Sequence, residues 1–254
     1  MRIVIKIGTS TIAHKTGRLN IRISDRLTEI ISDIINEGNE VVIVSSGAIG
    51  MGVGKLGLPG RPDDIAGKQA AAAVGQCELM YTYDRLFARY NHTVAQILLT
   101  ASDFTNADRH GNFTNTVGRL LEFGAVPVIN ENDTVATEEI KLGDNDTLSA
   151  KVAVSVKADL LILLSDIDGL YTADPHKDSD AKLIRTVDRI DDALYAIAGG
   201  KGSSLGTGGM KTKLDAAAIC LENGCDMVIA NGSDPDVLYR ILDGTEEKCT
   251  LFKA

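Results

Sequence analysis

The chain opens with Arg2-Ile-Val-Ile-Lys-Ile-Gly8, an apolar run that contains one lysine. A run of this kind is typical of a strand buried on both faces of a parallel sheet. Because a buried ammonium group is costly unless an anion meets it, Lys6 indicates a bound anion. The alternative is an edge strand with the ammonium group of Lys6 in water, which is common. A turn rich in hydrogen-bond donors follows at Gly8, Thr9 and Ser10.

A second stretch that indicates an anion is Gly206-Thr-Gly-Gly-Met-Lys-Thr-Lys213, with a helical run from Leu214 to Leu221 directly after it. Glycines let backbone N–H groups approach a phosphate, a helix N-terminus carries partial positive charge, and two lysines add full charge. The alternative is a mobile loop before a helix, since Gly199 to Gly209 is rich in glycine and serine. Lys6 and this loop can meet at one phosphate only in a compact parallel α/β fold, whose strand C-termini share one rim.

Composition and charge permit this fold and exclude several classes of partner. The 254 residues are 44% apolar and 24% charged, which suits a large core in one domain or in two close lobes. With 26 basic and 35 acidic residues the net charge is −9, so we expect neither nucleic acid nor a membrane as a partner. We expect no signal peptide or membrane span. Reduced thiols and a cytoplasmic location fit the four cysteines, which lack metal-site spacing: Cys77, Cys220, Cys225 and Cys249.

Strand-like and helix-like segments alternate along the chain. Apolar runs predict strands at Ile3 to Ile7, Val41 to Val44, Thr93 to Leu99, Val126 to Ile129, Leu160 to Leu164 and Met227 to Ala230. Apolar spacings of three and four predict helices at Ile21 to Glu37, Ala66 to Tyr90, Arg109 to Phe123, Asp146 to Val156, Met210 to Asn223 and Pro235 to Leu242. This order predicts a mostly parallel sheet with helices on both faces. We also expect a hairpin around Thr134 to Leu142. Thr172 to Asp180 is predicted to be a polar loop and is a candidate hinge between lobes.

The sequence around two motif matches argues against the function that each motif usually indicates. Gly52 to Gly57 matches G-x-G-x-x-G, but seven residues separate it from the strand ending at Val44 and no helix follows it, so a dinucleotide site is not expected. Asp166-Ile-Asp168-Gly resembles the start of a calcium loop, yet it lacks the third acidic position and the closing glutamate. A turn that closes the preceding strand explains this segment more simply.

Polar clusters stand at the predicted strand ends and before one helix: Val44-Ser-Ser-Gly-Ala-Ile-Gly50, Ile129-Asn-Glu-Asn-Asp-Thr134 and Gly143-Asp-Asn-Asp-Thr147. Each alone has a structural explanation, as a helix cap, a polar turn or an acidic helix start. Together they would place hydroxyls, amides and carboxylates around one rim. Such a rim suits a small zwitterion better than an apolar ligand.

Seven segments spread over the chain carry a family resemblance: Val4-Ile-Lys-Ile-Gly-Thr-Ser10, Ser45-Ser-Gly-Ala-Ile49, Lys68-Gln-Ala-Ala-Ala-Ala-Val-Gly-Gln76, Val126-Pro-Val-Ile-Asn-Glu-Asn-Asp133, Gly143-Asp-Asn-Asp146, Asp168-Gly-Leu-Tyr-Thr-Ala-Asp-Pro175 and Gly206-Thr-Gly-Gly-Met-Lys-Thr-Lys213. On these segments the chain resembles the amino acid kinase family, and within it the members that phosphorylate glutamate. The opening lysine segment and Asp168 to Pro175 are shared widely in the superfamily. The segments that look specific to the glutamate-phosphorylating members are Asn130 to Asp133, Gly143 to Asp146 and Gly206 to Lys213.

The resemblance implies a fold, a three-layer αβα sandwich around a mostly parallel central sheet. It implies one amino acid kinase domain over residues 1–254, with about 1–164 as the amino-acid substrate lobe and about 165–254 as the nucleotide lobe. Many members carry an additional C-terminal domain that resembles those of RNA-modifying enzymes. We do not expect that domain in these 254 residues.

The activity that the resemblance implies is ATP-dependent phosphorylation of the γ-carboxylate of L-glutamate, the first committed step towards proline. It also implies Mg²⁺ as cofactor, a homo-oligomer (dimer or tetramer) and proline as feedback inhibitor. A carboxylate with a pKa of about 4.3 is already ionised at pH 7, so the acceptor needs no general base. The enzyme must instead neutralise charge as two anions meet, which lysines and Mg²⁺ can do.

The resemblance also implies roles for individual residues. Lys6 and Lys213 would hold the phosphoryl group, and Asp146 would hold both lysines by ion pairing. Glutamate would be bound by Ser46, Asp133 and Asn145, with Asp133 as the partner of its α-ammonium group. The nucleotide would be bound by Lys6, Ser165, Asp166, Thr207, Gly208, Gly209, Met210, Lys211, Thr212 and Lys213. No direct metal ligand is predicted, since ATP phosphates and water can hold Mg²⁺.

Two other functions stay open on the sequence alone. A relative that phosphorylates aspartate or a nucleoside monophosphate would keep the nucleotide half and change the acceptor pocket, and glutamate-dependent ADP release separates the two. A non-catalytic ligand sensor on the same fold need not retain Lys6, Asp146 and Lys213 together, and this chain has all three.

Overall fold

The computed structural model describes the chain except residues 15, 17, 137–144, 176 and 199–208. Within the described residues, one sheet of eight strands has the order β3-β4-β2-β1-β5-β7-β8-β6. The strands are β1 (Arg2–Ile7), β2 (Glu40–Ser45), β3 (Thr93–Leu99), β4 (Ala125–Glu131), β5 (Leu160–Ser165), β6 (Thr186–Val187), β7 (Asp226–Asn231) and β8 (Cys249–Phe252). All neighbours are parallel except β7 and β8, which are antiparallel.

The six strands predicted from apolar runs are confirmed, with ends that agree to within two residues. The prediction missed β6 and β8, which lie at one edge of the sheet. β6 has only two residues, and β8 alternates between buried and half-buried side chains. Neither contains the continuous apolar run by which a buried parallel strand is recognised in a sequence.

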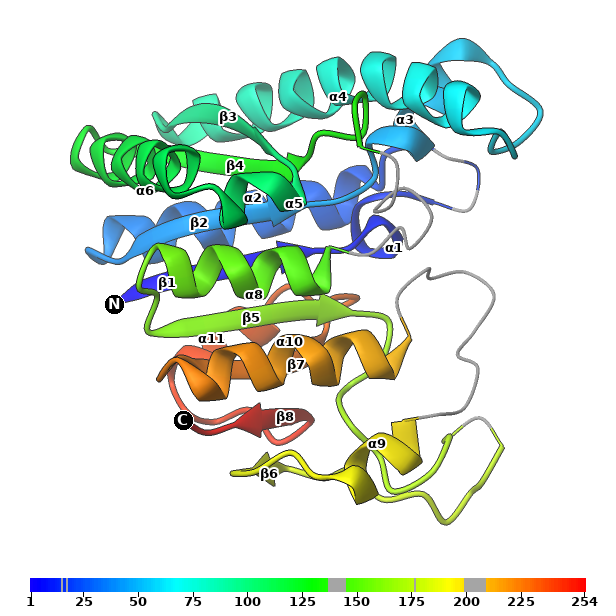
Figure 1. The fold of residues 1–254 in the computed structure, drawn as a ribbon, viewed down its shortest axis with the longest axis vertical. Helices are drawn as coiled ribbons and strands as arrows, with labels where there is room; N and C mark the ends of the chain where they lie inside the picture. The colour runs from blue at the N-terminus through cyan, green and yellow to red at the C-terminus, as the bar shows by residue number, and fades with distance from the viewer. Residues whose placement is uncertain (15, 17, 137–144, 176, 199–208) are drawn as a thin grey trace.

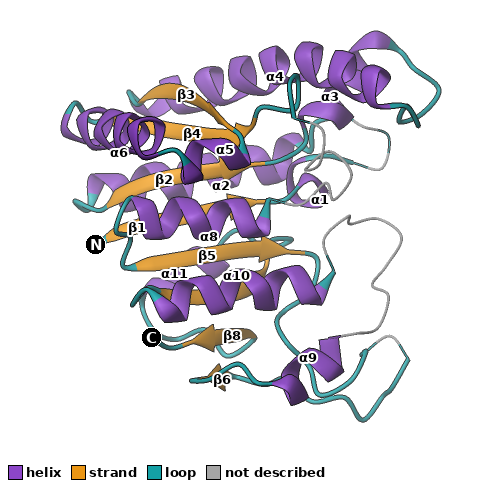
Figure 2. Cartoon of the chain, in the orientation of Figure 1, coloured by secondary structure: helices purple, strands orange, loops and turns teal. Residues whose placement is uncertain are grey.

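Helices cover both faces of the sheet, which confirms the expected three-layer α/β arrangement (Figure 1; Figure 2). In front of the sheet lie α6 (Ala107–Glu122), α8 (Asp146–Ser155) and α10 (Met210–Glu222). Behind it lie α2 (Ile21–Asn36), α4 (Ile65–Phe87) and α11 (Val237–Leu242). The periodic predictions are confirmed for these helices, although α6 begins two residues earlier and α11 two residues later than predicted. Ala88–Tyr90, directly after α4, forms a 3₁₀ turn, η1.

The side chains of β1 alternate between the two faces, as they must in a strand. Ile3 and Ile5 belong to the buried cluster that includes Ile30 of α2, whereas Val4 belongs to the cluster that includes Leu214 of α10. Lys6 is the next residue after Ile5 in this alternation. It therefore points to the same face as Val4, towards α8 and α10.

Four short helices in the described part of the chain were not predicted: α1 (Thr9–Ile12), α3 (Ala48–Leu56), α5 (Ala101–Thr105) and α9 (Asp192–Ala198). The rejected G-x-G-x-x-G match begins inside α3, and its first glycine, Gly52, packs against α4. A Cβ atom at Gly52 would lie 1.8 Å from the carbonyl oxygen of Ala71 on α4, and one at Gly75 would lie 1.7 Å from that of Ala48. The two helices can approach this closely only with glycine at both positions.

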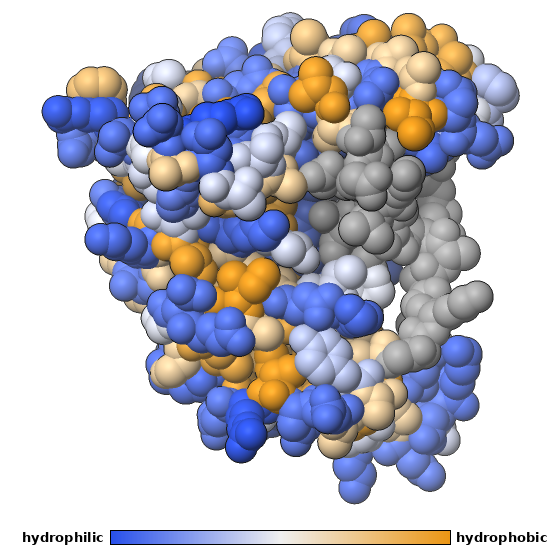
Figure 3. All heavy atoms as spheres, in the orientation of Figure 1, coloured by the Kyte–Doolittle hydropathy of each residue, from blue (hydrophilic) through white to orange (hydrophobic). Residues whose placement is uncertain are grey.

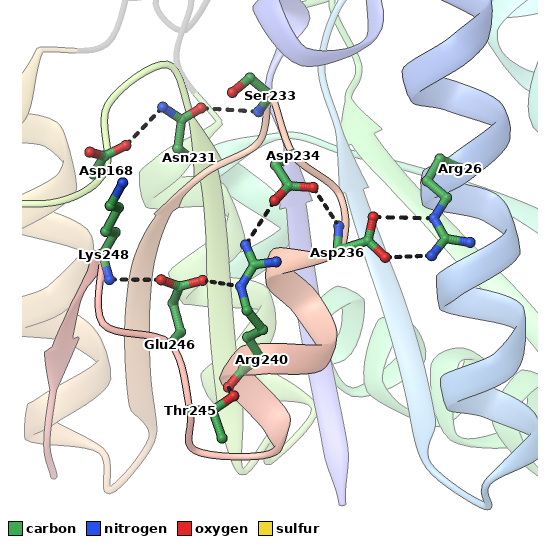
Figure 4. Close-up of polar contacts among 10 residues, drawn as sticks. All are labelled: Arg26, Asp168, Asn231, Ser233, Asp234, Asp236, Arg240, Thr245, Glu246 and Lys248. Carbon is green, nitrogen blue, oxygen red and sulfur yellow. Dashed lines mark hydrogen bonds and ion pairs between the residues drawn. The ribbon is translucent and has the colours of Figure 1, made fainter.

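Polar contacts tie the C-terminal part of the chain to α2 (Figure 4). Arg26 of α2 pairs with Asp236, the residue before α11. Arg240 of α11 pairs in turn with Asp234 at 2.9 Å. The pair of Arg26 with Asp236 crosses the expected boundary near residue 164, and the sheet continues across it from β5 to β7. The division into a substrate lobe and a nucleotide lobe therefore remains a proposal about function.

Two expectations concern loops. The expected hairpin around Thr134 to Leu142 lies mostly outside the described residues. The described residues of Thr172 to Asp180 form a loop, as expected, and contain no helix or strand. The role of this loop as a hinge stays a prediction. No helix in the described part of the chain is long and apolar enough to span a membrane.

Candidate active site

The carboxyl ends of the central strands meet at one edge of the sheet, which we call the rim (Figure 1). Here Ser46 follows β2, Glu131 ends β4 and Ser165 ends β5. The first residues of α8 and α10, Asp146 and Met210, lie at the same edge. Parallel strands bring their carboxyl ends together in this way, and open α/β sheets bind ligands there. The polar clusters noted in the sequence are thus neighbours in space.

Lys6, Asp146 and Lys213 form a buried charged cluster at this rim. Lys6 Nζ lies 2.7 Å from Asp146 Oδ1, and Lys213 Nζ lies 2.8 Å from Asp146 Oδ2. The carboxylate is fully buried, and the lysine side chains are 10% and 8% exposed. Burial alone would raise the pKa of Asp146, but the two ammonium groups outweigh burial and hold this pKa well below its usual range. The three side chains together formally carry two positive charges and one negative charge.

Three separate elements supply this cluster. β1 carries Lys6 on its front face, α8 begins at Asp146, and the first turn of α10 carries Lys213. A carboxylate is favoured at a helix N-terminus, where the backbone N–H groups are unpaired within the helix. Thr212 Oγ1 donates to the carbonyl oxygen of Gly209 at 2.7 Å, which ties the start of α10.

Two of the expected glutamate ligands, Ser46 and Asp133, come after the ends of β2 and β4. The backbone N–H of Ser46 donates to the Ile7 carbonyl oxygen at 3.1 Å, which joins the ends of β2 and β1. Asp133 lies in the turn after β4, where burial raises its pKa to about 6, although the charge of Arg61 acts in the opposite direction. A small cavity of about 10 Å³ lies beside Asp133, and Gln76 also lines it.

Asn145, the residue before α8, belongs to a chain of buried amides. Its Nδ2 donates to the Ser45 carbonyl oxygen at 2.7 Å and to Asn130 Oδ1 at 2.8 Å. Asn130 Nδ2 donates in turn to Gln76 Oε1 at 2.9 Å. Sequence reasoning assigned no role to Asn130 or Gln76. Both residues nevertheless belong to segments that carry the family resemblance, Val126 to Asp133 and Lys68 to Gln76.

Ser165 and Asp166, the expected nucleotide ligands after β5, line a cavity of about 310 Å³. Hydroxyl and amide side chains form most of its wall, and its full lining is Ser10, Thr11, Asn20, Ile23, Ser165, Asp166, Asn231 and Ser233. The loop after β5 is tied to the end of β7, because Asn231 Nδ2 donates to Asp168 Oδ1 at 2.9 Å (Figure 4). The segment from Asp166 to Gly169 is a bend at the end of β5, as the turn interpretation expected.

The glycine-rich loop is described only from Gly209 onward. Gly209 is the N-cap of α10, and Met210 is its first residue. Thr207 and Gly208 lie outside the described residues. Lys211 is exposed and pairs with Asp215 at 3.0 Å, one turn further along α10, unlike the buried Lys213.

The described residues of the rim do not form a preformed metal site. Within the described residues, no three His, Cys, Asp or Glu side chains gather so that they could hold a metal ion. Both carboxylate oxygens of Asp146 are already paired with lysines. This donor set fits a Mg²⁺ ion that arrives with a polyphosphate and takes its oxygens from phosphate and water.

Comparison with known proteins gives concordant results. The profile described as "Amino acid kinase family" matches residues 1–231. The chain is 52% identical over 252 residues to "Glutamate 5-kinase" of Caldanaerobacter subterraneus subsp. tengcongensis, which covers 99% of this chain and 68% of that protein. It is 53% identical over 251 residues to "Glutamate 5-kinase" of Clostridium acetobutylicum, which covers 99% of this chain and 94% of that protein.

Solved structures agree on the fold. Isopentenyl phosphate kinase of T. acidophilum has a TM-score of 0.67 at 18% identity, with 100% of both chains covered. UMP kinase from Ureaplasma parvum has a TM-score of 0.67 at 17% identity, with 100% of this chain and 98% of that chain covered. At these identities the likeness concerns the fold alone.

Proposed function

The chain belongs to the amino acid kinase family, and we propose that its rim transfers the γ-phosphoryl group of ATP to the γ-carboxylate of L-glutamate. The products are ADP and L-glutamyl 5-phosphate, and this reaction begins proline biosynthesis. The observation that carries the proposal is the identity of about half the residues, along nearly the whole chain, with proteins named Glutamate 5-kinase. The buried cluster of Lys6, Asp146 and Lys213 supports it chemically, because an excess positive charge suits a phosphoryl group in transfer.

In this proposal Lys6 and Lys213 stabilise the negative charge that develops on the phosphoryl oxygens. Asp146 holds the two ammonium groups near each other and orients them, since each of its oxygens pairs with one of them. The acceptor carboxylate is already ionised at pH 7, so no residue has to remove a proton from it. Mg²⁺, bound with the nucleotide, supplies further neutralisation of the phosphates.

The amino-acid substrate binds through Ser46, Asp133 and Asn145. The carboxylate of Asp133 pairs with the α-ammonium group of glutamate. Ser165, Asp166 and the start of α10 from Gly209 to Lys213 bind the nucleotide, together with Thr207 and Gly208. Ser46 follows β2 and Ser165 ends β5, and the flanking of β1 by these two strands supports this division.

One experiment tests the activity and its acceptor. The purified chain is incubated with ATP and Mg²⁺ and offered glutamate, aspartate or acetylglutamate separately, while hydroxylamine traps any acyl phosphate as a hydroxamate. We expect hydroxamate and ADP with glutamate alone. Equal product from aspartate, or ADP release that does not depend on the amino acid, would contradict the proposal.

We further propose that proline inhibits at the glutamate site, that the protein acts in the cytoplasm and that it forms a homo-oligomer. Exposed apolar side chains at the α3 end of the molecule support assembly (Figure 3). They include Leu56, Leu58 and Ile65, which are 48%, 38% and 38% exposed. Light scattering at several protein concentrations tests for a dimer or a tetramer, and a constant monomer mass would contradict assembly.

A further inference from the structure

Three amide side chains form one hydrogen-bonded chain beneath the proposed glutamate site. Gln76 Oε1 accepts from Asn130 Nδ2 at 2.9 Å, and Asn130 Oδ1 accepts from Asn145 Nδ2 at 2.8 Å. All three side chains are buried. They come from α4, from the end of β4 and from the residue before α8. Elements that are distant in the sequence are thus linked directly under one side of the rim.

Backbone groups determine which way each amide points. The N–H of Glu131 donates to Asn130 Oδ1 at 2.9 Å, and the carbonyl oxygen of Ser45 accepts from Asn145 Nδ2 at 2.7 Å. A backbone N–H can only donate and a backbone carbonyl can only accept. Exchanging N and O in either asparagine would therefore set donor against donor or acceptor against acceptor. Gln76 then has to present its oxygen to Asn130.

This polarity fixes what Asn145 can offer to a ligand. Both hydrogens of Asn145 Nδ2 are used inside the protein. Only the carbonyl oxygen, Oδ1, remains, and that atom accepts hydrogen bonds. An acceptor of this kind suits an ammonium group and disfavours a carboxylate. Gln76 also lines the small cavity beside Asp133, whose carboxylate is the proposed partner of the same ammonium group.

We propose that Gln76 is a positioning residue for the amino-acid substrate. By accepting from Asn130 Nδ2 it satisfies that buried amide and keeps Asn130 in the polarity that the backbone N–H of Glu131 sets, and this polarity leaves Asn145 Oδ1 for the α-ammonium group of glutamate. Without this acceptor, a buried N–H of Asn130 has no partner, and the strained Asn130 holds Asn145 less firmly. The inference rests on the proposed function, because it takes glutamate as the ligand.

The structure also says which replacements of Gln76 should work. Within the described part of the chain, Gln76 Nε2 is buried and has no hydrogen-bond partner. The oxygen is thus the only part of the amide that the chain requires. Gln76→Glu keeps an oxygen acceptor in either protonation state, whereas Gln76→Met and Gln76→Leu have none.

The test measures KM for glutamate and for ATP separately in the full chain. We expect Gln76→Met and Gln76→Leu to raise KM for glutamate about tenfold and to leave KM for ATP within about twofold, while Gln76→Glu keeps both KM values near those of the wild type. Thermal unfolding identifies any variant that fails to fold, and two variants without an acceptor guard against losing one of them.

Tyr83→Phe is the matched control. Tyr83 is buried on the same helix and its hydroxyl lies 2.9 Å from Ser45 Oγ, outside the amide chain. We expect it to leave KM for glutamate unchanged. The inference is overturned if Gln76→Met and Gln76→Leu bind glutamate normally, if KM for ATP rises equally, or if Gln76→Glu or Tyr83→Phe raises KM for glutamate as much. A wild type with no glutamate-dependent ADP release would instead overturn the proposed function itself.

Discussion

Asp146 sets the charge that the rim presents to a ligand. Its two oxygens each hold one lysine, so two positive charges are kept close together around a single negative one. Removing one partner of a buried ion pair is strongly destabilising, since it leaves an uncompensated charge. Here either lysine can be removed while Asp146 keeps the other. This redundancy allows the contribution of each lysine to catalysis to be measured in a folded protein.

Replacing either lysine by methionine, Lys6→Met or Lys213→Met, is expected to lower kcat at least about 100-fold. The reason is that each ammonium group stabilises charge that develops during phosphoryl transfer. Steady-state kinetics with glutamate and ATP measure the effect. Lys55→Met is the matched control, because Lys55 is an exposed lysine that pairs with Glu78 on the surface. Near-normal turnover in both site variants would contradict the proposed role of the two lysines in phosphoryl transfer.

A second prediction concerns the pH dependence of glutamate binding. Burial raises the pKa of Asp133 to about 6, so its carboxyl becomes neutral as the pH falls below that value. A neutral carboxyl cannot pair with the α-ammonium group by charge. We therefore expect KM for glutamate to rise between pH 7 and pH 5, while KM for ATP changes little over the same range.

Asp133→Asn separates this titration from others. The variant should have a high KM for glutamate at every pH and should lose the rise between pH 7 and pH 5. A rise in the variant as steep as in the wild type would assign the titration to another group. The sign for stability is the reverse of the usual aspartate case: because the folded pKa lies above the unfolded value of 3.8, the contribution of Asp133 to the unfolding free energy falls as the pH rises through about 4 to 6.

At the scale of elements, the contact of α3 with α4 places two parts of the proposed glutamate site. α3 begins directly after Ser46, and α4 carries Gln76. Gly75 allows the contact, since a Cβ atom there would lie 1.7 Å from the Ala48 carbonyl oxygen and 2.5 Å from the Gly52 nitrogen. Both of these are backbone atoms, so a side-chain rotation cannot relieve the overlap.

Gly75→Ala is therefore expected to lower the free energy of unfolding by about 1 to 3 kcal/mol and to raise KM for glutamate more than KM for ATP. Urea unfolding and steady-state kinetics measure the two effects. Gly118→Ala on α6 is the control, because nothing lies within 4 Å of its Cβ position. That change should stabilise by about 0.5 to 1 kcal/mol through helix propensity. A stable Gly75→Ala variant with normal kinetics would show that α3 can move freely.

At the scale of the whole molecule, one sheet carries both halves of the proposed reaction. The end of β2 leads to Ser46, and the end of β5, on the other side of β1, is Ser165. In the proposed function, the charged cluster of Lys6, Asp146 and Lys213 thus lies between an amino-acid side and a nucleotide side. An amino acid that competes with glutamate can act at its own side without touching the nucleotide.

Proline presents a carboxylate beside a cationic amine, as glutamate does. We therefore predict that proline inhibits competitively with glutamate and non-competitively with ATP. Titrations of proline at several glutamate concentrations measure this, and Asp133→Asn should weaken inhibition and glutamate binding together. Inhibition that does not weaken as glutamate rises would indicate a separate proline site.

Much of the fold could be predicted because burial on both faces leaves a local record in a sequence. β1, β2 and β5 are continuous apolar runs, and α2 repeats its apolar residues with a helical period. α3 and β8 were missed for the opposite reason. α3 is glycine-rich, and its glycines, which have no side chain, let it pack closely against α4. β8 lies near the sheet edge with only part of its surface buried.

The sequence by itself determined the parallel α/β class and the order of the main elements, and it predicted an anionic partner for Lys6, since Lys6 interrupts a run that has to be buried. Only the tertiary structure decided that Asp146 lies between Lys6 and Lys213, and that Gln76, Asn130 and Asn145 join in one chain of hydrogen bonds. The physical reason is range. Periodicity and composition act between near neighbours in the chain, whereas the direction of a hydrogen bond or an ion pair depends on how distant elements pack.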